Sequence, residues 1–340
     1  MSEFAPKSNV LLTGDRPTGR LHLGHYVGSI KNRVDLQNDT SITKRFYMVA
    51  DLQGLTDNFN NPEKIRDNVR EVILDNLACG LDPEKTTIFI QSTIPFIAEL
   101  TMLFMNLVTV SRLKRNPTVK EDIKEKNFGE AVPAGFLTFP ISQAADILCV
   151  KADIVPVGAD QMPHIEQTNE IGASFNRMYA PLFPYVKGVI SEYPRLVGTD
   201  GNAKASKSLG NAIYLSDSFE EISKKVMSMY TDPNHVNVAD PGKVEGNVVF
   251  TYLDIFDDKK DEVAELKAQY MKGGLGDVVL KKRLIDVLEN VIAPIRAKRE
   301  ELEKNPEYID KILKQGFETT MKETEKIRDE VREAVKLYNI

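Results

Sequence analysis

Three short apolar runs separated by helical patterns limit the folds open to this chain. Residues 10–12, 46–50 and 86–90 are continuously apolar or β-branched, which is typical of parallel strands buried on both faces. Between the second and third runs, Asn61 and Pro62 predict a helix start, and Gly80 predicts its end. Strand–helix–strand units of this length join parallel strands through right-handed crossovers. The sequence therefore predicts an α/β fold built on a Rossmann-type parallel sheet.

The pattern changes near residue 215, where we place a domain boundary. Residues 1–214 are predicted to form a Rossmann-type catalytic domain that binds a nucleotide, with a helical and mobile excursion at about 94–140. Within that excursion, residues 94–111 are expected to be apolar and helical, and the polar, turn-rich residues 116–129 to form an excursion from the sheet or a mobile lid. Residues 215–340 show only helical patterns interrupted by proline and glycine turns, so they are predicted to form an all-helical domain.

Composition excludes several classes of protein. No apolar run approaches the roughly 20 residues that span a bilayer, and the first residues lack the pattern of a signal peptide. Cys79 and Cys149 are isolated from metal-ligand partners, which argues against a zinc site, an iron–sulfur cluster or a disulfide framework. We therefore expect a cytoplasmic protein with no membrane partner.

The distribution of charge says more than its sum. A net charge of −6 argues weakly against nucleic-acid binding, but basic stretches occur at 112–115, 281–283 and 296–299. Each stretch is compatible with a solvated helix face, and together they leave room for a confined RNA-binding surface. We expect the segment 281–299 to carry such contacts.

The stretch 13–25 has the features of a phosphate-binding turn. It follows the first strand, is broken by glycine and proline, and leads into a helix start that carries His22, Gly24 and His25. Phosphates favour helix N-termini, where unpaired N–H groups and the positive end of the helix dipole face them. Imidazole N–H groups can add donors there. A His-x-Gly-His pattern also fits a solvated helix terminus, so this stretch alone does not establish a site.

Two more polar segments lie farther along the chain. Residues 158–161, Gly-Ala-Asp-Gln, end a strand predicted at 153–157, and ligands of open α/β sheets bind at such strand ends. Lys204 and Lys207 lie on a long loop that contains glycines, where they can close over an anionic ligand.

These segments, in this order along the chain, resemble the signatures of the class I aminoacyl-tRNA synthetases. Residues 22–25, His-Leu-Gly-His, stand at the position of the family's HIGH signature. Residues 204–208 resemble its KMSKS signature, with Ala205 in place of the usual methionine, and the turn at 158–161 is similar to the Gly-x-Asp-Gln turn of the tyrosyl/tryptophanyl subgroup. The resemblance implies that the C-terminal helical half binds the tRNA anticodon.

The resemblance implies activation of an amino acid by ATP. The amino-acid carboxylate that attacks the α-phosphate is already ionised near neutral pH, so the protein must supply alignment and charge stabilisation rather than a general base. The implied catalytic residues are His22, His25, Lys204 and Lys207. The implied ATP-binding residues are Asp15, Arg16, Gly24, His25, Lys120, Gly158, Asp160, Lys204, Ser206 and Lys207. The family also implies Mg²⁺ carried by the ATP phosphates, and no protein site for a metal is predicted.

The amino-acid substrate is implied by Asp146. Residues 144–148 and 153–158 resemble tryptophanyl-tRNA synthetases, in which a carboxylate at this position accepts the indole N–H. The implied tryptophan-binding residues are Leu12, Gln143, Asp146, Val155, Val157 and Gln161. Phe139, where relatives often carry tyrosine, and Gln143, where many carry methionine, depart from this pattern and leave a tyrosine enzyme open.

The predicted function is the ATP-dependent ligation of L-tryptophan to its tRNA through a tryptophanyl-adenylate, with release of AMP and pyrophosphate. A tyrosyl-tRNA synthetase is the nearest alternative. A small-molecule nucleotidylyltransferase shares the His-x-Gly-His turn but not the lysine loop or the helical half. A non-catalytic RNA-binding paralogue would not need both histidines and both lysines. The resemblance further implies a homodimer, formed through the apolar segment 94–111.

Overall fold

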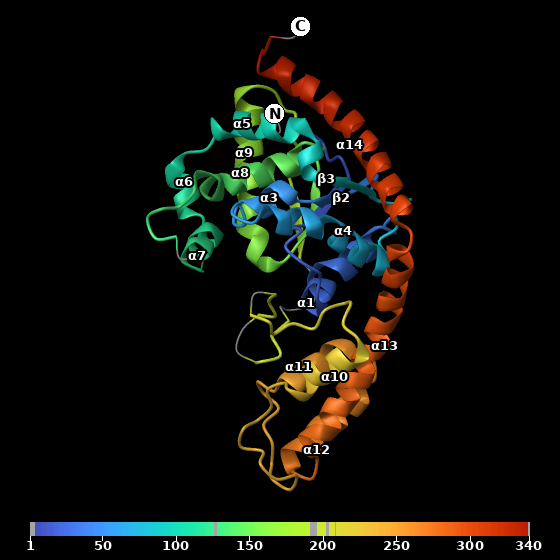
Figure 1. Cartoon of the computed structure of the whole chain (residues 1–340). Coiled ribbons are helices and arrows are strands. Elements are labelled where there is room, and N and C mark those ends of the chain that lie inside the picture. Colours follow the sequence, from blue (N-terminus) through green and yellow to red (C-terminus); the bar gives the residue numbers. More distant parts are fainter. Residues whose placement is uncertain (1–3, 126–127, 191–195, 202–203, 208, 339–340) are drawn as a thin grey trace. The chain divides into compact units, whose positions relative to one another are not determined.

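A single parallel sheet confirms the predicted α/β architecture. Within the described residues its five strands lie in the order β3–β2–β1–β4–β5, and every neighbouring pair is parallel. The strands β2 and β3 are labelled in Figure 1. The strands are β1 Val10–Asp15, β2 Lys44–Val49, β3 Thr87–Ile90, β4 Ile154–Val157 and β5 Lys187–Ile190. The first four follow predicted runs, whereas β5 was not predicted.

The strand order reverses at β1, and ligands of open α/β sheets bind at the carboxyl ends of the strands beside such a reversal, here β1 and β4. These two strands pair through Leu11 and Ile154. The Asp153 carboxylate, just before β4, accepts the N–H groups of Asn9 at 3.1 Å and Val10 at 2.8 Å. This contact fixes the start of β1 against β4, so the two segments that follow these strands leave the sheet from a defined place.

The computed structural model describes residues 4–125, 128–190, 196–201, 204–207 and 209–338. The chain divides into two compact units. The sheet unit comprises Met1–Gly19, Lys31–Ser191 and Asn305–Ile340, and the helical unit comprises Arg20–Ile30 and Glu192–Lys304. No helix within the described residues is both long enough and apolar enough to cross a bilayer.

This division differs from the boundary expected near residue 215. The segment Arg20–Ile30 belongs with the later part of the chain, because Leu23 N–H donates to the Ile213 carbonyl at 2.9 Å and Leu215 N–H to the Leu21 carbonyl at 3.1 Å. The final segment, Asn305–Ile340, belongs with the sheet.

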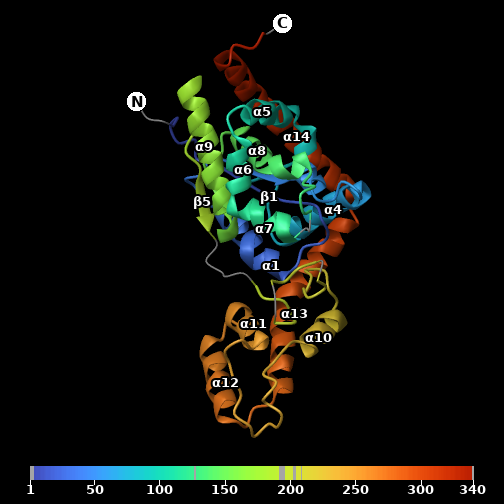
Figure 2. The ribbon, with the colours of Figure 1, turned by 90° about the vertical axis from the view of Figure 1, so that its left-hand side faces the viewer.

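Helices surround the sheet in the sheet unit. They are α2 Lys31–Leu36, α3 Asp51–Leu55, α4 Pro62–Ala78, α5 Pro95–Met105, α6 Val110–Arg115, α7 Pro117–Glu125, α8 Ala134–Leu148, α9 Met162–Met178 and α14 Pro306–Ala334. Two 3₁₀ turns, η2 Gln91–Thr93 and η3 Ala159–Gln161, follow β3 and β4. Helix α9 lies beside β5 (Figure 2). A continuous buried apolar core includes Leu12, Phe46, Phe89, Leu148 and Phe175.

The helix α4 has the predicted ends. The Asn61 side chain accepts the Lys64 N–H, and Gly80 adopts a φ of 102°, a left-handed conformation that glycine allows. The segment 94–111, expected to be helical, forms α5 and the start of α6, and the chain turns between them, where Thr109 caps the second helix. The lid expected at 116–129 begins instead as the helix α7.

The helical unit contains a short helix that carries the two histidines and a bundle of longer helices. These are α1 Leu23–His25, the π-helix η1 Tyr26–Ile30, α10 Phe219–Met227, α11 Val248–Phe256, α12 Lys260–Lys272 and α13 Asp277–Glu303. Helices α10 and α11 both pack on α13. Ile222, Val249 and Leu284 are buried in this packing, so the helical pattern predicted after residue 217 is confirmed for the described residues.

The helix α14 lies along β3, the strand at one edge of the sheet (Figure 1). A glycine makes this close approach possible, because a Cβ atom on Gly316 would lie 1.7 Å from the Ile88 carbonyl oxygen. Ile327 and Val331 of the same helix join the core of the sheet unit. An unpaired strand edge is a site for aggregation, and a packed helix covers it.

Replacing Gly316 by alanine is therefore expected to push α14 away from β3. We expect a loss of about 3 kcal/mol in the free energy of unfolding, at the upper end of what overpacking costs. Denaturant unfolding measures this loss. Gly135→Ala is the matched control, because a Cβ at this helical position meets nothing within 4 Å. The control should be neutral or stabilising by up to about 1 kcal/mol, and a Gly316→Ala protein as stable as its parent would contradict the packing argument.

Candidate active site

The two histidines of the first motif cap the helix in which they lie. His22 is the N-cap of α1, with an extended backbone, and its Nδ1 accepts the Gly24 N–H at 3.1 Å. The His25 Nδ1 in turn accepts the His22 N–H at 3.3 Å, and the ring centroids are 3.9 Å apart. Because each Nδ1 is an acceptor, each neutral ring carries its proton on Nε2. Both rings are thereby prepared to donate from the same atom.

His22 stays neutral over the physiological pH range. Burial, together with the electrostatic influence of His25, Lys207 and Lys204, lowers its pKa to about 2. The side chain is 4% exposed. His22 can therefore supply a hydrogen-bond donor without a charge, whereas the lysines supply the positive charge of this site.

The lysine loop is held at its base by a side chain that sequence reasoning missed. The Asn211 Oδ1 accepts the Ser206 N–H at 2.8 Å, and its Nδ2 donates to Asp200 Oδ1 at 3.1 Å. The backbone of Lys204 forms an antiparallel bridge with Val197. Asn211 is 5% exposed. It therefore positions the segment that carries Lys204 and Lys207, whereas Ser208 of the expected motif lies outside the described residues.

The lysine loop packs against the histidine turn. Ala205 is 2% exposed, and its Cβ would lie 3.8 Å from a Cβ placed on Gly24. The same added Cβ would lie 2.9 Å from the His22 ring, so only glycine fits there. The two motifs, nearly 180 residues apart in the chain, thus form one structure inside the helical unit. Ala205, which replaces the expected methionine, serves as a packing residue in it.

Asp146 is a buried carboxylate in the sheet unit. It lies on α8 and is 2% exposed. Gln91 donates to its Oδ1 at 2.7 Å, and Gln53 to its Oδ2 at 3.4 Å. Burial raises the pKa of Asp146 to about 7, although the donors Gln91 and Gln53 oppose this rise. Neither glutamine was predicted, but Gln91 directly follows a predicted strand and Gln53 lies shortly after another, and polar residues at strand ends are a usable signal.

The remaining residues of the expected tryptophan set lie on β1, α8, β4 and the turn after β4. Leu12 and Val155 are buried, at 2% and 6% exposure, and Val157 is half-buried. Gln143 and Gln161 are half-buried polar side chains, and Gln161 Nε2 donates to Asp160 Oδ2 at 3.3 Å. The set therefore combines apolar walls with a few polar groups, as ligand sites do.

The turn after β4 is tied to the helix that carries Lys120. The Thr118 hydroxyl, on α7, donates to the Asp160 carbonyl at 3.1 Å. An added Cβ on Gly158 would lie 2.7 Å from Asp160 Oδ1, so a larger residue there would displace the Asp160 carboxylate. Lys120 is exposed on the same helix as Thr118. The turn that carries Gly158 and Asp160 is thus tied to α7, the helix that also carries Lys120.

Asp15 was expected to bind ATP, but its carboxylate already has partners within the protein. Its carboxylate is paired with the buried guanidinium of Arg33 and accepts the Tyr47 hydroxyl at 3.0 Å and the Asn76 amide at 3.1 Å. These contacts hold the end of β1. Arg16, the next residue, has a side chain that is 52% exposed and lies 3.5 Å from Asp57.

The basic stretches are largely engaged within the protein. Lys281 donates to the Met227 and Met229 carbonyls, both at 2.9 Å, and Arg283 pairs with Asp257 at 2.7 Å. Further ion pairs join Arg112 to Glu170, Arg296 to Glu289, Lys298 to Glu301 and Arg299 to Glu303. Lys282 is exposed. RNA contacts by segment 281–299 stay a prediction. These ion pairs reduce the number of basic side chains that are available to contact RNA.

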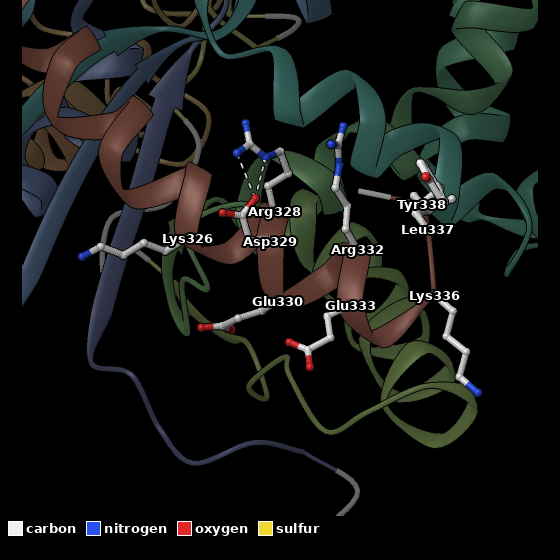
Figure 3. A pocket seen from close by; sticks show the side chains of 9 residues that line it. All are labelled: Lys326, Arg328, Asp329, Glu330, Arg332, Glu333, Lys336, Leu337 and Tyr338. Atoms are coloured by element: carbon white, nitrogen blue, oxygen red, sulfur yellow. Dashed lines mark hydrogen bonds and ion pairs between the residues drawn. The ribbon is translucent and has the colours of Figure 1, made fainter. Parts of the chain in front are cut away.

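A surface hollow of about 1000 Å³ lies at the C-terminal end of α14 (Figure 3). None of the predicted site residues lines it. Its lining residues are Lys326, Arg328, Asp329, Glu330, Arg332, Glu333, Lys336, Leu337 and Tyr338. Arg328 pairs with Asp329 and Arg332 with Glu99, so positive and negative groups balance there. The hollow has no charge preference that would select an anionic nucleotide.

The expected site residues fall into two groups. The helical unit brings together His22, Gly24, His25, Lys204, Ser206 and Lys207. The sheet unit holds Asp15, Arg16, Lys120, Gly158, Asp160 and the whole tryptophan set. Among the residues that the structure describes, no group of three or more His, Cys, Asp or Glu side chains is arranged to hold a metal ion.

Comparisons with known proteins show which family this chain resembles along most of its length. A family model described as tRNA synthetases class I (W and Y) matches residues 6–293. The chain is similar to the tryptophan–tRNA ligase of Clostridium longisporum, with 55% identity over 332 residues that cover 96% of each chain. It is also similar to that of Streptococcus mutans, with 57% identity over 318 residues that cover 91% of this chain and 93% of the relative.

Two solved structures are similar over nearly the whole length. Tryptophanyl-tRNA synthetase from Campylobacter jejuni, complexed with ADP and tryptophane, matches with a TM-score of 0.84 and 29% identity over 96% of this chain and 100% of that chain. The enzyme from Mycoplasma pneumoniae matches with a TM-score of 0.79 and 25% identity over 97% of this chain and 98% of that chain.

Proposed function

This chain belongs to the class I tRNA synthetases for tryptophan and tyrosine, and from that premise we propose how its residues divide the work of the reaction. The chain ligates L-tryptophan to tRNA with ATP. In the first step the tryptophan carboxylate attacks the α-phosphate, and pyrophosphate leaves. In the second step a ribose hydroxyl at the end of the tRNA attacks the adenylate carbonyl, and AMP leaves.

The helical unit supplies the phosphate chemistry in this proposal. His22 and His25 donate from Nε2 to phosphate oxygens, and Lys204 and Lys207 stabilise the charge that develops on the leaving pyrophosphate. The observation that carries the proposal is the packing of Ala205 against Gly24. This packing holds the histidine donors and the lysine cations together within the helical unit. Mg²⁺ arrives with ATP, and the phosphate oxygens supply most of its ligands.

The sheet unit supplies amino-acid recognition. Asp146 accepts the indole N–H, and Leu12, Val155 and Val157 line the apolar part of the pocket. The polar end of the amino acid meets Gln143 and Gln161. Asp160, Gly158 and Lys120 meet the nucleotide, together with Asp15 and Arg16 at the end of β1. A buried acceptor matched to one donor rejects side chains that leave it unpaired.

Substrate-dependent exchange between ATP and pyrophosphate tests this function. We expect tryptophan, and neither tyrosine nor phenylalanine, to support exchange, and a chelator of divalent ions to stop it. Exchange that responds to tyrosine and not to tryptophan would overturn the choice of substrate. Similarity to the ligases of Clostridium and Streptococcus favours tryptophan over the tyrosine alternative.

The partners follow from the same proposal. The helices α10 to α13 form the tRNA-binding part, and the enzyme acts as a homodimer in the cytoplasm. The exposed side chains of Met102, Met105 and Val110, at 67%, 40% and 58%, support an apolar contact between two copies at the expected segment. Sedimentation equilibrium gives the oligomeric state directly, and a monomer at micromolar concentration would contradict this part.

A further inference from the structure

Two glutamines from neighbouring strand ends meet at the buried carboxylate of Asp146. Gln53 lies in α3, which follows β2, and Gln91 begins η2, which follows β3. They are 8% and 0% exposed. Since β2 and β3 are adjacent and parallel, both side chains leave the same edge of the sheet and reach α8 together.

The contacts fix which end of each amide faces Asp146. The Gln91 Oε1 accepts the Gln53 backbone N–H at 3.0 Å, so its Nε2 must point the other way, toward Asp146 Oδ1 at 2.7 Å. The Gln53 Nε2 is shared between the Phe139 carbonyl at 3.3 Å and Asp146 Oδ2 at 3.4 Å. Asp51 accepts the Ser92 N–H at 2.9 Å and so ties α3 to η2. The two amides are therefore held in place by contacts other than those with Asp146.

We propose that Gln91 and Gln53 are positioning residues that keep Asp146 ionised and leave its Oδ2 as the acceptor for the substrate N–H. This inference rests on the proposed function, in which Asp146 receives the indole. Oδ1 is committed to the short bond from Gln91, whereas among the described residues Oδ2 receives one long bond from a donor that is shared with a second acceptor. A protonated carboxyl would place an O–H donor in a site that has to accept an N–H.

The charges around Asp146 agree with this role. Burial raises the pKa of Asp146, the donors Gln91 and Gln53 lower it, and the charge of Asp51 on α3 raises it. At the C-cap of α8 the Cys149 thiol donates to the Asp146 carbonyl, and burial holds the pKa of this thiol well above its usual range. From α9, His164 stacks edge-on against Phe139, and burial lowers the pKa of His164 to about 4. None of these neighbours replaces the two amide donors.

Tryptophan affinity measured against pH tests the inference. The chain contains no tryptophan, so fluorescence of the bound amino acid can be followed without a protein indole signal. For the parent we expect affinity to fall as the pH drops below about 7, where Asp146 takes up a proton. Gln91→Met should move this midpoint upward by roughly one to two pH units. Affinity near neutral pH should then fall roughly tenfold or more and recover at higher pH. Gln53→Met should cause a smaller shift in the same direction.

Gln37→Met is the matched control. Gln37 is also buried, and its amide bridges the Gly80 carbonyl at 2.9 Å and the Asp82 N–H at 2.8 Å. Gln37→Met should leave the pH midpoint of tryptophan affinity unchanged. A Gln91→Met protein that binds more weakly at every pH with the parent's midpoint would show a merely structural role and overturn the inference.

Asp146→Asn separates this inference from the proposed function. If the asparagine variant keeps the parent's affinity and pH midpoint, Asp146 is not the indole acceptor, and the substrate assignment falls together with the inference. If it abolishes the midpoint while Gln91→Met leaves it in place, only the role of the glutamines falls.

Discussion

Replacing Lys207 by alanine is expected to slow formation of the adenylate roughly 10²–10³-fold. The ammonium group acts on charge that grows as pyrophosphate leaves, so its contribution is larger in the transition state than in the substrate complex. The tryptophan set lies in the sheet unit and Lys207 in the helical unit, so the affinity for tryptophan alone should not change. Exchange between ATP and pyrophosphate measures the rate, and tryptophan fluorescence measures the affinity.

Lys224→Ala provides the control for charge, because Lys224 is exposed on α10 in the same unit. Its exchange rate should match that of the parent. Lys204→Ala should resemble Lys207→Ala, and the double variant should lose less than the product of the two effects, since both cations act on one group. Equal losses of rate and tryptophan affinity in Lys207→Ala would remove the argument that this lysine acts in the transition state.

Asp146→Asn is expected to weaken tryptophan binding roughly 10²-fold, which corresponds to about 3 kcal/mol. The carboxamide has one oxygen, and Gln91 already donates to the carboxylate at 2.7 Å. The amide nitrogen of the variant then opposes the indole N–H, so a buried donor loses its partner. The KM for ATP should stay near that of the parent, because the expected contacts with ATP are made by other residues.

Thermal unfolding distinguishes the weaker tryptophan binding of Asp146→Asn from a general loss of structure. Burial raises the pKa of Asp146 from 3.8 to about 7. Between these values the folded protein holds a proton that the unfolded chain has released, so this group makes stability fall as the pH rises through that window. An asparagine has no charge to bury. Asp146→Asn should therefore melt no lower than the parent above pH 7, and a markedly lower melting temperature would mean that its weak binding reflects unfolding.

Prediction from the sequence succeeded where a local pattern and its burial agree. The strands β2 and β3 are continuous apolar runs, and the parallel sheet buries both of their faces. The β5 segment Lys187–Ile190 gives no such signal, because it contains a glycine and has an exposed residue at each end. Pairing with β4 makes it a strand, and that pairing is a tertiary contact.

The helix α7 shows a signal that was present but not used. The pair Asn61–Pro62 correctly predicted the start of α4, and Asn116–Pro117 has the same form. The Asn116 side chain accepts the Thr118 N–H at 3.1 Å and begins the helix. The polar composition that follows favours an excursion or a lid, although a helix that is exposed on one side is also polar.

The division into units could not be predicted from composition. The boundary expected near residue 215 separates mixed from helical patterns in the sequence, but α14 has the same helical pattern whichever unit it packs on. What decides its place is Gly316, which fits against the Ile88 carbonyl, and a lone glycine in a helix does not identify its partner. In the same way, Gln53 and Gln91 are ordinary polar residues until the fold brings them to Asp146.

The position of α14 has a consequence for synthesis of the chain on the ribosome. β3 is complete once Ile90 has been added. The helix that covers it, α14, is formed by residues 306–334, which are added more than 200 positions later. During that interval the edge of a nearly finished sheet is open to pairing with another chain. A nascent chain truncated before Pro306 should therefore aggregate more readily than the full-length protein, and the last helix completes the first domain to be made.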